Sequence, residues 1–227
     1  MNILAEIFDF FLPRICPGCG NKLTVAERTI CPVCLNKIKL AREERLCREY
    51  ERKFRAKKII SGFTSLYVFE EGKEFQNIIH SLKYNGRFAV GVFLGKQLGN
   101  HIANMMNEWH IDIIIPIPLH QLKKAERGYN QSFYIAKGLG SVLNIPVKQN
   151  IVKRKRFTQS QTTMNLKERE ENIRDAFLIR NSKGLSGKNI LLIDDVITTG
   201  ATISECGRIL LEAGASRIYA ASTAIAD

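Results

Sequence analysis

Residues 190–203 read ILLIDDVITTGATI, and this stretch indicates the fold class of the chain. The four apolar residues that open it predict a short strand buried on both faces. Two adjacent aspartates follow. Burying both carboxylates in an apolar core would cost a large free energy of desolvation, so we expect them at the rim of a sheet where the strand ends. The Thr- and Gly-rich turn after them leads into a predicted helix.

The turn after the aspartates has the composition of an anion site. Its backbone N–H groups lie at the N-terminus of a predicted helix, where a phosphate is favoured. Its members are Thr198, Thr199, Gly200, Ala201 and Thr202. Asp194 and Asp195 can accept hydrogen bonds from vicinal hydroxyls or hold a divalent ion through water. Together the two parts suit a ribose 5-phosphate, and the alternative is a helix N-cap beside a solvated aspartate pair.

Further apolar stretches extend this pattern along the chain. Strands are predicted at 63–69, 111–115, 147–152, 190–193 and 218–221, and helices at 72–82, at 89–106, after Gly128 and at 202–213. Strands that alternate with helices predict an α/β domain with a mainly parallel sheet flanked by helices on both faces. Ligands bind such sheets at the carboxyl ends of the strands, which is where the two aspartates fall.

Four of the six cysteines form two CxxC pairs separated by 11 residues, namely Cys16, Cys19, Cys31 and Cys34. Zinc takes four thiolates in a tetrahedron, and each CxxC turn presents two, so we expect a closed structural zinc site. Two disulfides, or a redox-active CxxC, are the alternatives. Cys47 stands alone in a charged run, and Cys206 lies on the apolar face of a predicted helix, where a buried thiol is the usual outcome.

The first residues, NILAEIFDFFLP, are apolar but too short to span a bilayer and too acidic for a signal peptide. Helical spacing of the apolar residues predicts a short amphipathic helix that docks on the body of the protein, with membrane-surface binding as the weaker alternative. We therefore expect a cytoplasmic protein. Residues 37–58 predict a charged helical connector, which divides the chain into an N-terminal region, 1–58, and an α/β domain, 59–227.

The net charge of +12 is unusually high. Residues 1–60 hold 13 Lys and Arg against 7 Asp and Glu, and residues 150–190 hold 10 against 4. Such a surface favours polyanionic partners, such as nucleic acid, an anionic membrane or a pyrophosphate-bearing substrate. A basic protein with no such partner is the alternative.

Several motifs occur in order along the chain: LKYNGR at 82–87, IPIPLH at 115–120, ERGYNQS at 126–132 and LLIDDVITTGAT at 191–202. A further set comprises Arg156, Thr158, Gln161, Leu166, Arg169, Asn172, Ala176 and Phe177. LLIDDVITTGAT resembles the motif that binds phosphoribosyl pyrophosphate (PRPP) in type I phosphoribosyltransferases. Nearly the whole chain resembles the ComF/ComFC family of competence-associated proteins, which pairs a zinc-binding cysteine region with a phosphoribosyltransferase domain.

The resemblance implies a role for each part of the site. Asp194 and Asp195 would meet the ribose hydroxyls and Mg²⁺, and the turn 198–202 would hold the 5-phosphate. The pyrophosphate side would comprise Pro118, Leu119, His120, Lys123, Arg127 and Arg156. His120 has a packing or hydrogen-bonding role as its alternative. The basic segment 153–170 occupies the place of the mobile loop that closes over the substrate in type I enzymes.

Two functions follow from the resemblance. The first is Mg²⁺-dependent transfer of a phosphoribosyl group to an unknown acceptor, with release of pyrophosphate, in a protein that acts in DNA uptake and natural transformation. The second is a catalytically silent PRPP-binding protein that handles single-stranded DNA, with other competence proteins such as a DNA helicase as partners. Many relatives carry more cysteine pairs than this chain, so a second zinc site is not expected.

Overall fold

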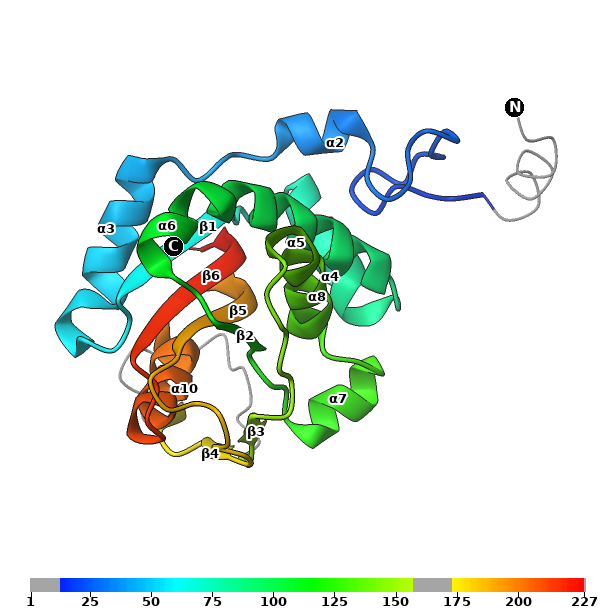
Figure 1. Ribbon diagram of the computed structural model, residues 1–227. Helices are drawn as coiled ribbons and strands as arrows, with labels where there is room; N and C mark the ends of the chain where they lie inside the picture. The colour runs from blue at the N-terminus through cyan, green and yellow to red at the C-terminus, as the bar shows by residue number, and fades with distance from the viewer. Residues whose placement is uncertain (1–12, 157–172, 227) are drawn as a thin grey trace.

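The computed structural model describes residues 13–156 and 173–226 (Figure 1). The expected N-terminal helix and most of the basic segment 153–170 lie outside these ranges. The helices are α2 (Pro32–Lys37), α3 (Glu43–Lys53), η1 (Arg55–Lys57), α4 (Glu74–Tyr84), α5 (Phe88–Ile102), η2 (Ala103–Met105), α6 (Met106–Trp109), α7 (Gln121–Arg127), α8 (Gln131–Leu143) and α10 (Ala201–Glu212). The strands are β1 (Gly62–Val68), β2 (Ile113–Pro116), β3 (Val152–Arg154), β4 (Phe177–Ile179), β5 (Asn189–Ile197) and β6 (Arg217–Ile225).

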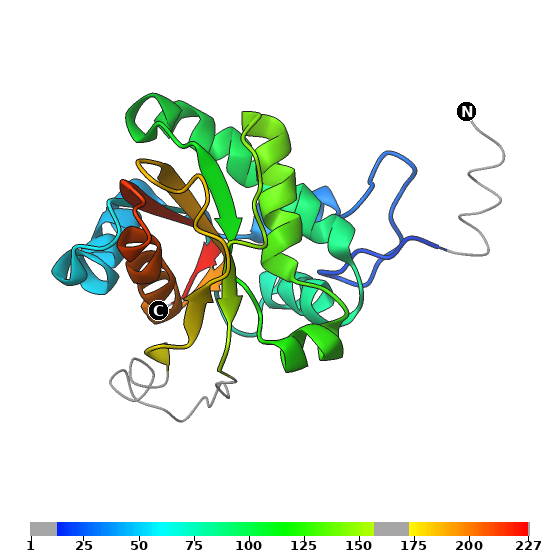
Figure 2. The same ribbon diagram turned by 60° about the horizontal axis from the view of Figure 1, so that its bottom comes forward.

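Four parallel strands form the central sheet in the order β1-β6-β5-β2. Isolated bridges extend it at both edges: Val147 pairs with Ile114 of β2, and Leu40 pairs with Tyr67 of β1. A separate antiparallel pair, β3 and β4, lies at the end of the molecule that also carries the carboxyl ends of the central strands (Figure 2).

Helices cover both faces of the sheet, as the alternation of strands and helices predicts. Leu191 and Ile193 of β5 join a core with α4, α5 and α8, whereas Ile190 and Leu192 join a second core with α3 and α10. Figure 2 shows the two layers on opposite sides of the sheet, with α3 and α10 on the same side. Because β5 is apolar on both faces up to Ile193, it can only lie in the middle of such a sandwich.

Glycines let α5 and α8 approach at backbone distance. A Cβ atom added at Gly95 would lie 2.0 Å from the carbonyl oxygen of Ile135, and one at Gly138 would lie 2.1 Å from that of Val92. No other residue fits at either position without moving a helix, so this contact fixes how α8 presents its N-terminus to the sheet.

The structure corrects several expected boundaries. β5 does not end at Ile193 but continues through both aspartates to Ile197. After Lys37, which ends α2, the connector 37–58 is helical only over α3 and η1, and residues 39–41 run extended along β1. The expected strand 147–152 is reduced to the single bridge at Val147 and the start of β3. Helix α7, between the motifs IPIPLH and ERGYNQS, was not expected.

Within the described ranges, 13–156 and 173–226, no helix has both the length and the apolar character needed to cross a bilayer.

Candidate functional site

The two aspartates of β5 lie where β5 passes the N-terminus of α8. Ser132 Oγ donates a hydrogen bond to Asp194 Oδ1 at 3.0 Å, and the backbone N–H of Asp195 donates to the same oxygen at 2.9 Å. Lys83 Nζ lies 2.7 Å from Asp195 Oδ2. Asp194 is half-buried and Asp195 is only 5% exposed, so the alternative of a solvated aspartate pair is wrong for Asp195. Its desolvation is offset by the ammonium of Lys83.

The two neighbouring carboxylates have opposite pKa shifts. Burial raises the pKa of Asp194 to about 8, and the negative charge of Asp195 adds to the rise. Burial would also raise the pKa of Asp195, but the Lys83 ammonium, together with hydrogen bonds from Asp194 and the N–H of Val196, outweighs it and the pKa is lowered. Asp195 is therefore the stable anion of the pair, and Asp194 is the carboxyl that a hydroxyl-bearing or cationic ligand would draw into its charged form.

The turn after β5 has the form of an anion site. Gly200 adopts the left-handed conformation at φ 74° and is the N-cap of α10. Thr199 Oγ1 accepts a hydrogen bond from the N–H of Ala201 at 3.3 Å. Thr198 is exposed, and Thr199 and Thr202 are half-buried. The 12-residue helix α10 thus begins at a turn of small side chains at the same end of the sheet as the aspartates.

The loop predicted to face pyrophosphate lies beside the aspartates, between β2 and α7. The N–H of Ile117 donates to the carbonyl of Ile193 at 2.9 Å, and Asn130 Nδ2 donates to the carbonyl of Ile117 at the same distance. Pro118 is buried, and Leu119 and His120 are half-buried. His120 is the N-cap of α7, and its Nδ1 accepts a hydrogen bond from the N–H of Leu122 at 3.3 Å. This contact agrees with the alternative of hydrogen bonding within the fold, and the pyrophosphate-side role of His120 stays a prediction.

Several cations gather around this loop. Burial lowers the pKa of Lys123, and the positive charges of Arg154, Arg127 and Lys83 contribute to that shift. Arg154 is also within electrostatic range of Asp194, which acts against the lowering of the arginine pKa by burial. Cations gathered in this way repel one another, and an anion bound between them would offset that repulsion. The cluster therefore suits a polyanionic ligand.

Some residues of the site were not singled out from the sequence for these roles. Lys83 and Ser132 lie in the quoted motifs LKYNGR and ERGYNQS, but only the structure shows that they contact the aspartates. Of the two arginines of the basic segment that the structure describes, Arg154 is half-buried and interacts electrostatically with Asp194, and Arg156 is exposed. Position within a motif is the one signal that could have found Lys83 and Ser132.

The four CxxC cysteines converge on one point. Their Sγ atoms all lie within 4.8 Å of one another, and those of Cys19 and Cys31 are 3.8 Å apart. Four thiolates around zinc, with Zn–S bonds of about 2.3 Å, place sulfur atoms about 3.8 Å from each other, so the cluster fits the metal. The N–H of Cys31 donates to Cys16 Sγ at 3.4 Å. A Cβ atom at Gly18 would lie 2.8 Å from Cys34 Sγ, which explains the glycine.

Backbone donors also tune the thiols. Burial would raise the pKa of Cys16, but N–H groups from Cys31, Cys19 and Gly18 outweigh it and lower the pKa to about 7. Thiolate is the form that binds zinc, so these donors prepare a ligand. Cys206 is fully buried as predicted, and burial raises the pKa of its thiol, whereas Cys47 is exposed on α3.

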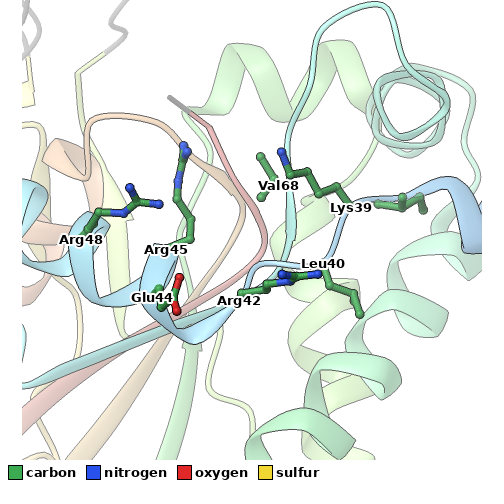
Figure 3. A pocket seen from close by; sticks show the side chains of 8 residues that line it. Lys39, Leu40, Arg42, Glu44, Arg45, Arg48 and Val68 are labelled. Carbon is green, nitrogen blue, oxygen red and sulfur yellow. The ribbon is translucent and has the colours of Figure 1, made fainter.

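A second basic surface lies far along the chain from the aspartates, beside α3. A pocket of about 590 Å³ is lined by Lys39, Arg42, Arg45, Arg48 and Glu44, together with Ile38, Leu40 and Val68. Figure 3 shows that its cations come from α3 and the extended segment before it. Arg45 Nε also lies 3.0 Å from Glu49 Oε1. We call the pocket with the cations Lys39, Arg42, Arg45 and Arg48 the α3 basic pocket.

Two family models match the chain. The phosphoribosyl transferase domain matches residues 129–225, and the double zinc ribbon domain matches residues 7–62. The described ranges contain one cluster of four cysteines, 16–34, inside the second match. The sheet, the helices on both faces and the turn 198–202 agree with a type I phosphoribosyltransferase fold.

Curated relatives match much of the chain. Competence protein F of Haemophilus influenzae is 32% identical over 145 residues, which is 62% of this chain and 63% of that protein. DNA utilization protein YhgH of Escherichia coli K12 is 29% identical over 144 residues, with the same coverage. The chain thus spans under two thirds of the length of these relatives. Competence protein ComFC of Bacillus subtilis is 24% identical over 212 residues, 93% of this chain and 84% of that protein.

Two solved structures that the chain matches are a PRPP amidotransferase and an adenine phosphoribosyltransferase. The glutamine PRPP amidotransferase of B. subtilis is 20% identical, with a TM-score of 0.38 over 64% of this chain and 26% of that one. The adenine phosphoribosyltransferase of Saccharomyces cerevisiae is 15% identical, with a TM-score of 0.41 over 68% and 75%.

Proposed function

Because the chain belongs to the ComF family, which joins a zinc-ribbon region to a phosphoribosyl transferase domain, we propose that it binds PRPP at the carboxyl end of its sheet. The observation that carries this proposal is that Asp194 and the turn 198–202 lie at the two ends of one short segment. Arg154 is within electrostatic range of Asp194. Asp194 accepts hydrogen bonds from the ribose hydroxyls. The N–H groups at the start of α10 bind the 5-phosphate.

Charge separates the roles of the two aspartates. Asp195 is paired with Lys83, so Asp194 is the carboxylate that we assign to the ribose and to Mg²⁺. A hard cation with oxygen ligands suits a site that offers a carboxylate and the oxygens of a pyrophosphate. Mg²⁺ would neutralise charge on the pyrophosphate. Lys123, Arg127 and Arg154 bind the remaining oxygens and stabilise the negative charge that grows as pyrophosphate departs.

We further propose that bound PRPP transfers its phosphoribosyl group. The bond between the anomeric carbon and the pyrophosphate oxygen breaks, and pyrophosphate leaves with the electron pair. The acceptor forms the new bond to that carbon and loses a proton to solvent or to a group of its own. The acceptor is unidentified. Tyr84, next to Lys83, is 50% exposed, and the Arg127 guanidinium lies 5.1 Å from its ring centroid.

Calorimetry with PRPP and Mg²⁺ tests the binding proposal. The double variant Asp194→Asn, Asp195→Asn should abolish measurable heat, whereas Asp112→Asn is the matched control. Asp112 lies before β2 at the opposite end of the sheet, where its carboxylate accepts hydrogen bonds from Lys188 and the N–H of Asn189. The control should bind PRPP as the wild type does. Unchanged affinity in the double variant would contradict the site.

Turnover is a separate question. Pyrophosphate release should be measured with nucleobases, nucleosides and amines as acceptors, at saturating PRPP and Mg²⁺. Release that depends on one acceptor and disappears in the Asp194→Asn variant would support transfer. PRPP binding without release across the panel would favour the silent PRPP-binding protein.

A second candidate function, handling of single-stranded DNA, is favoured by the α3 basic pocket. Arg42 is the N-cap of α3, and Arg45 and Arg48 follow at intervals of three residues on its first two turns. That spacing suits successive phosphates of a nucleic acid strand. The relatives named for competence and DNA utilization agree with this candidate.

Salt dependence tests the DNA candidate. Binding of an oligothymidylate should weaken as salt rises, with a slope that falls by about 0.7 for each phosphate that the protein no longer neutralises. Arg42→Gln with Arg48→Gln should reduce that slope. Arg180→Gln with Arg217→Gln, two exposed arginines elsewhere in the fold, removes the same charge and should leave it unchanged. Equal slopes for both double variants would contradict a role for the pocket.

A further inference from the structure

Helix α3 ends against the turn that follows β5. Its last residue, Lys53, has a side chain that is 5% exposed. Lys53 Nζ donates a hydrogen bond to the carbonyl oxygen of Thr198 and another, at 3.1 Å, to that of Ala226. The ammonium thus joins the connector between the cysteine cluster and β1 to the turn 198–202 and to the residue that follows β6.

Packing around Gly200 makes the same contact. A Cβ atom at Gly200 would lie 2.7 Å from the ring of Phe54 and 3.3 Å from Lys53 Cβ. Phe54 is 1% exposed, and its ring centroid lies 5.3 Å from that of Phe63 on β1. The end of α3 therefore packs closely against one side of the turn 198–202.

A buried carboxylate balances the ammonium. Glu49 Oε2 lies 3.1 Å from Lys53 Nζ and 2.7 Å from Arg52, and its Oε1 lies 3.0 Å from Arg45. Removing an ammonium from water is costly, and the ion pair with Glu49 offsets that cost.

The contact between Lys53 and Thr198 also orients the next peptide N–H. In a trans peptide the C=O and the following N–H point in opposite directions. By holding the carbonyl of Thr198 toward α3, Lys53 directs the N–H of Thr199 away from α3. That N–H precedes the first turn of α10, whose own N–H groups form the anion site.

We propose that Lys53 is a positioning residue that fixes the turn 198–202 for the 5-phosphate, and that it couples the zinc-side connector to this site. This inference rests on the proposed function. Lys53 does not touch the ligand and acts through the backbone of Thr198. This role predicts a selective effect. Loss of the Lys53 ammonium should weaken binding of the ribose 5-phosphate end of PRPP and leave binding of the pyrophosphate end unchanged.

Two probes separate the two ends. Calorimetry should be run with ribose 5-phosphate and with magnesium pyrophosphate on wild type, Lys53→Met and Arg52→Met. Lys53→Met keeps the aliphatic chain and should lower ribose 5-phosphate affinity at least tenfold while pyrophosphate affinity stays within twofold. Arg52→Met also removes a partner of Glu49, but the Arg52 side chain is 55% exposed and its contacts are with Glu49, so both affinities should be kept.

A measurement without ligand keeps the inference testable by itself. Amide hydrogen exchange at Thr199 in the free protein should be faster in Lys53→Met than in Arg52→Met. If Lys53→Met does not fold, Lys53→Gln, which retains one donor, should give an intermediate exchange rate and an intermediate affinity. Equal exchange in the Lys53 and Arg52 variants, or an equal fall in affinity for both probes, would overturn the positioning role. Wild type that binds neither probe would overturn the proposed function.

Discussion

Lys83 Nζ lies 2.7 Å from Asp195 Oδ2, and this contact joins the end of α4 to the strand that carries both aspartates. The side chains are 24% and 7% exposed. The pair lets β5 continue through two carboxylates, because one of them is matched by a cation from another element. It also leaves Asp194 as the carboxyl that is open to a ligand.

Loss of the Lys83 ammonium should therefore destabilise the fold. Lys83→Met would leave Asp195 charged, buried and uncompensated, and we expect urea unfolding to show a loss of about 2–3 kcal/mol, slightly below the ~3–5 kcal/mol typical of fully buried pairs because Lys83 is partly exposed. Lys188→Met is the matched control. Lys188 pairs with Asp112 at 2.9 Å near the surface, so its loss should cost under about 1 kcal/mol. Equal losses would show that Asp195 gains little from Lys83.

The cysteine cluster should hold one zinc ion. Elemental analysis of Cys34→Ser should find that zinc is lost, because the buried Cys34 supplies one of four Sγ atoms within 4.8 Å of each other. Thermal unfolding should move to lower temperature, since the metal stabilises the folded state. Cys47→Ser, at an exposed cysteine outside the cluster, should keep both the zinc content and the midpoint. Zinc retained by Cys34→Ser would contradict the cluster.

Local patterns predicted much of this fold. Apolar stretches predicted the positions of β2, β5 and β6, since strands buried on both faces need them, and β1 was predicted from a stretch that also holds Thr64 and Ser65. The spacing of the four cysteines predicted a site that the structure brings together. In both cases the physical cause acts within a few residues of the pattern itself.

What the sequence did not predict depends on distant partners. β5 extends past Ile193 because Lys83 and Ser132, from two helices, meet the aspartates there. Helix α7 is short and has no buried residue, so it leaves no apolar period to detect. In the sequence, Lys53 is one of many charged residues in the connector. Only the structure shows that it is buried and donates a hydrogen bond to the carbonyl of Thr198.

His101 should make stability fall at mildly acidic pH. Its Nε2 lies 3.0 Å from Thr64 Oγ1, and burial lowers the pKa of the imidazole below its usual value of about 6.5. Between the folded pKa and about 6.5 the unfolded chain binds more protons, so stability is complete above that range and is lost as pH falls through it. Denaturant unfolding of zinc-loaded protein from pH 7.5 to 5 should show a flatter profile for His101→Gln than for wild type. Parallel profiles would contradict a titrating His101.

The contact between α5 and α8 gives a prediction whose sign is informative. In an exposed helix, replacing glycine by alanine stabilises by about 1 kcal/mol. Gly95→Ala should instead destabilise by about 3 kcal/mol or more, because the new Cβ would lie 2.0 Å from the carbonyl oxygen of Ile135 and the helices would have to separate. Gln97→Ala, on the exposed face of the same helix, should change the free energy of unfolding by less than about 0.5 kcal/mol. A Gly95→Ala variant as stable as wild type would mean that α5 and α8 do not pack at backbone distance, and α8 could then not hold Ser132 against Asp194 as the site requires.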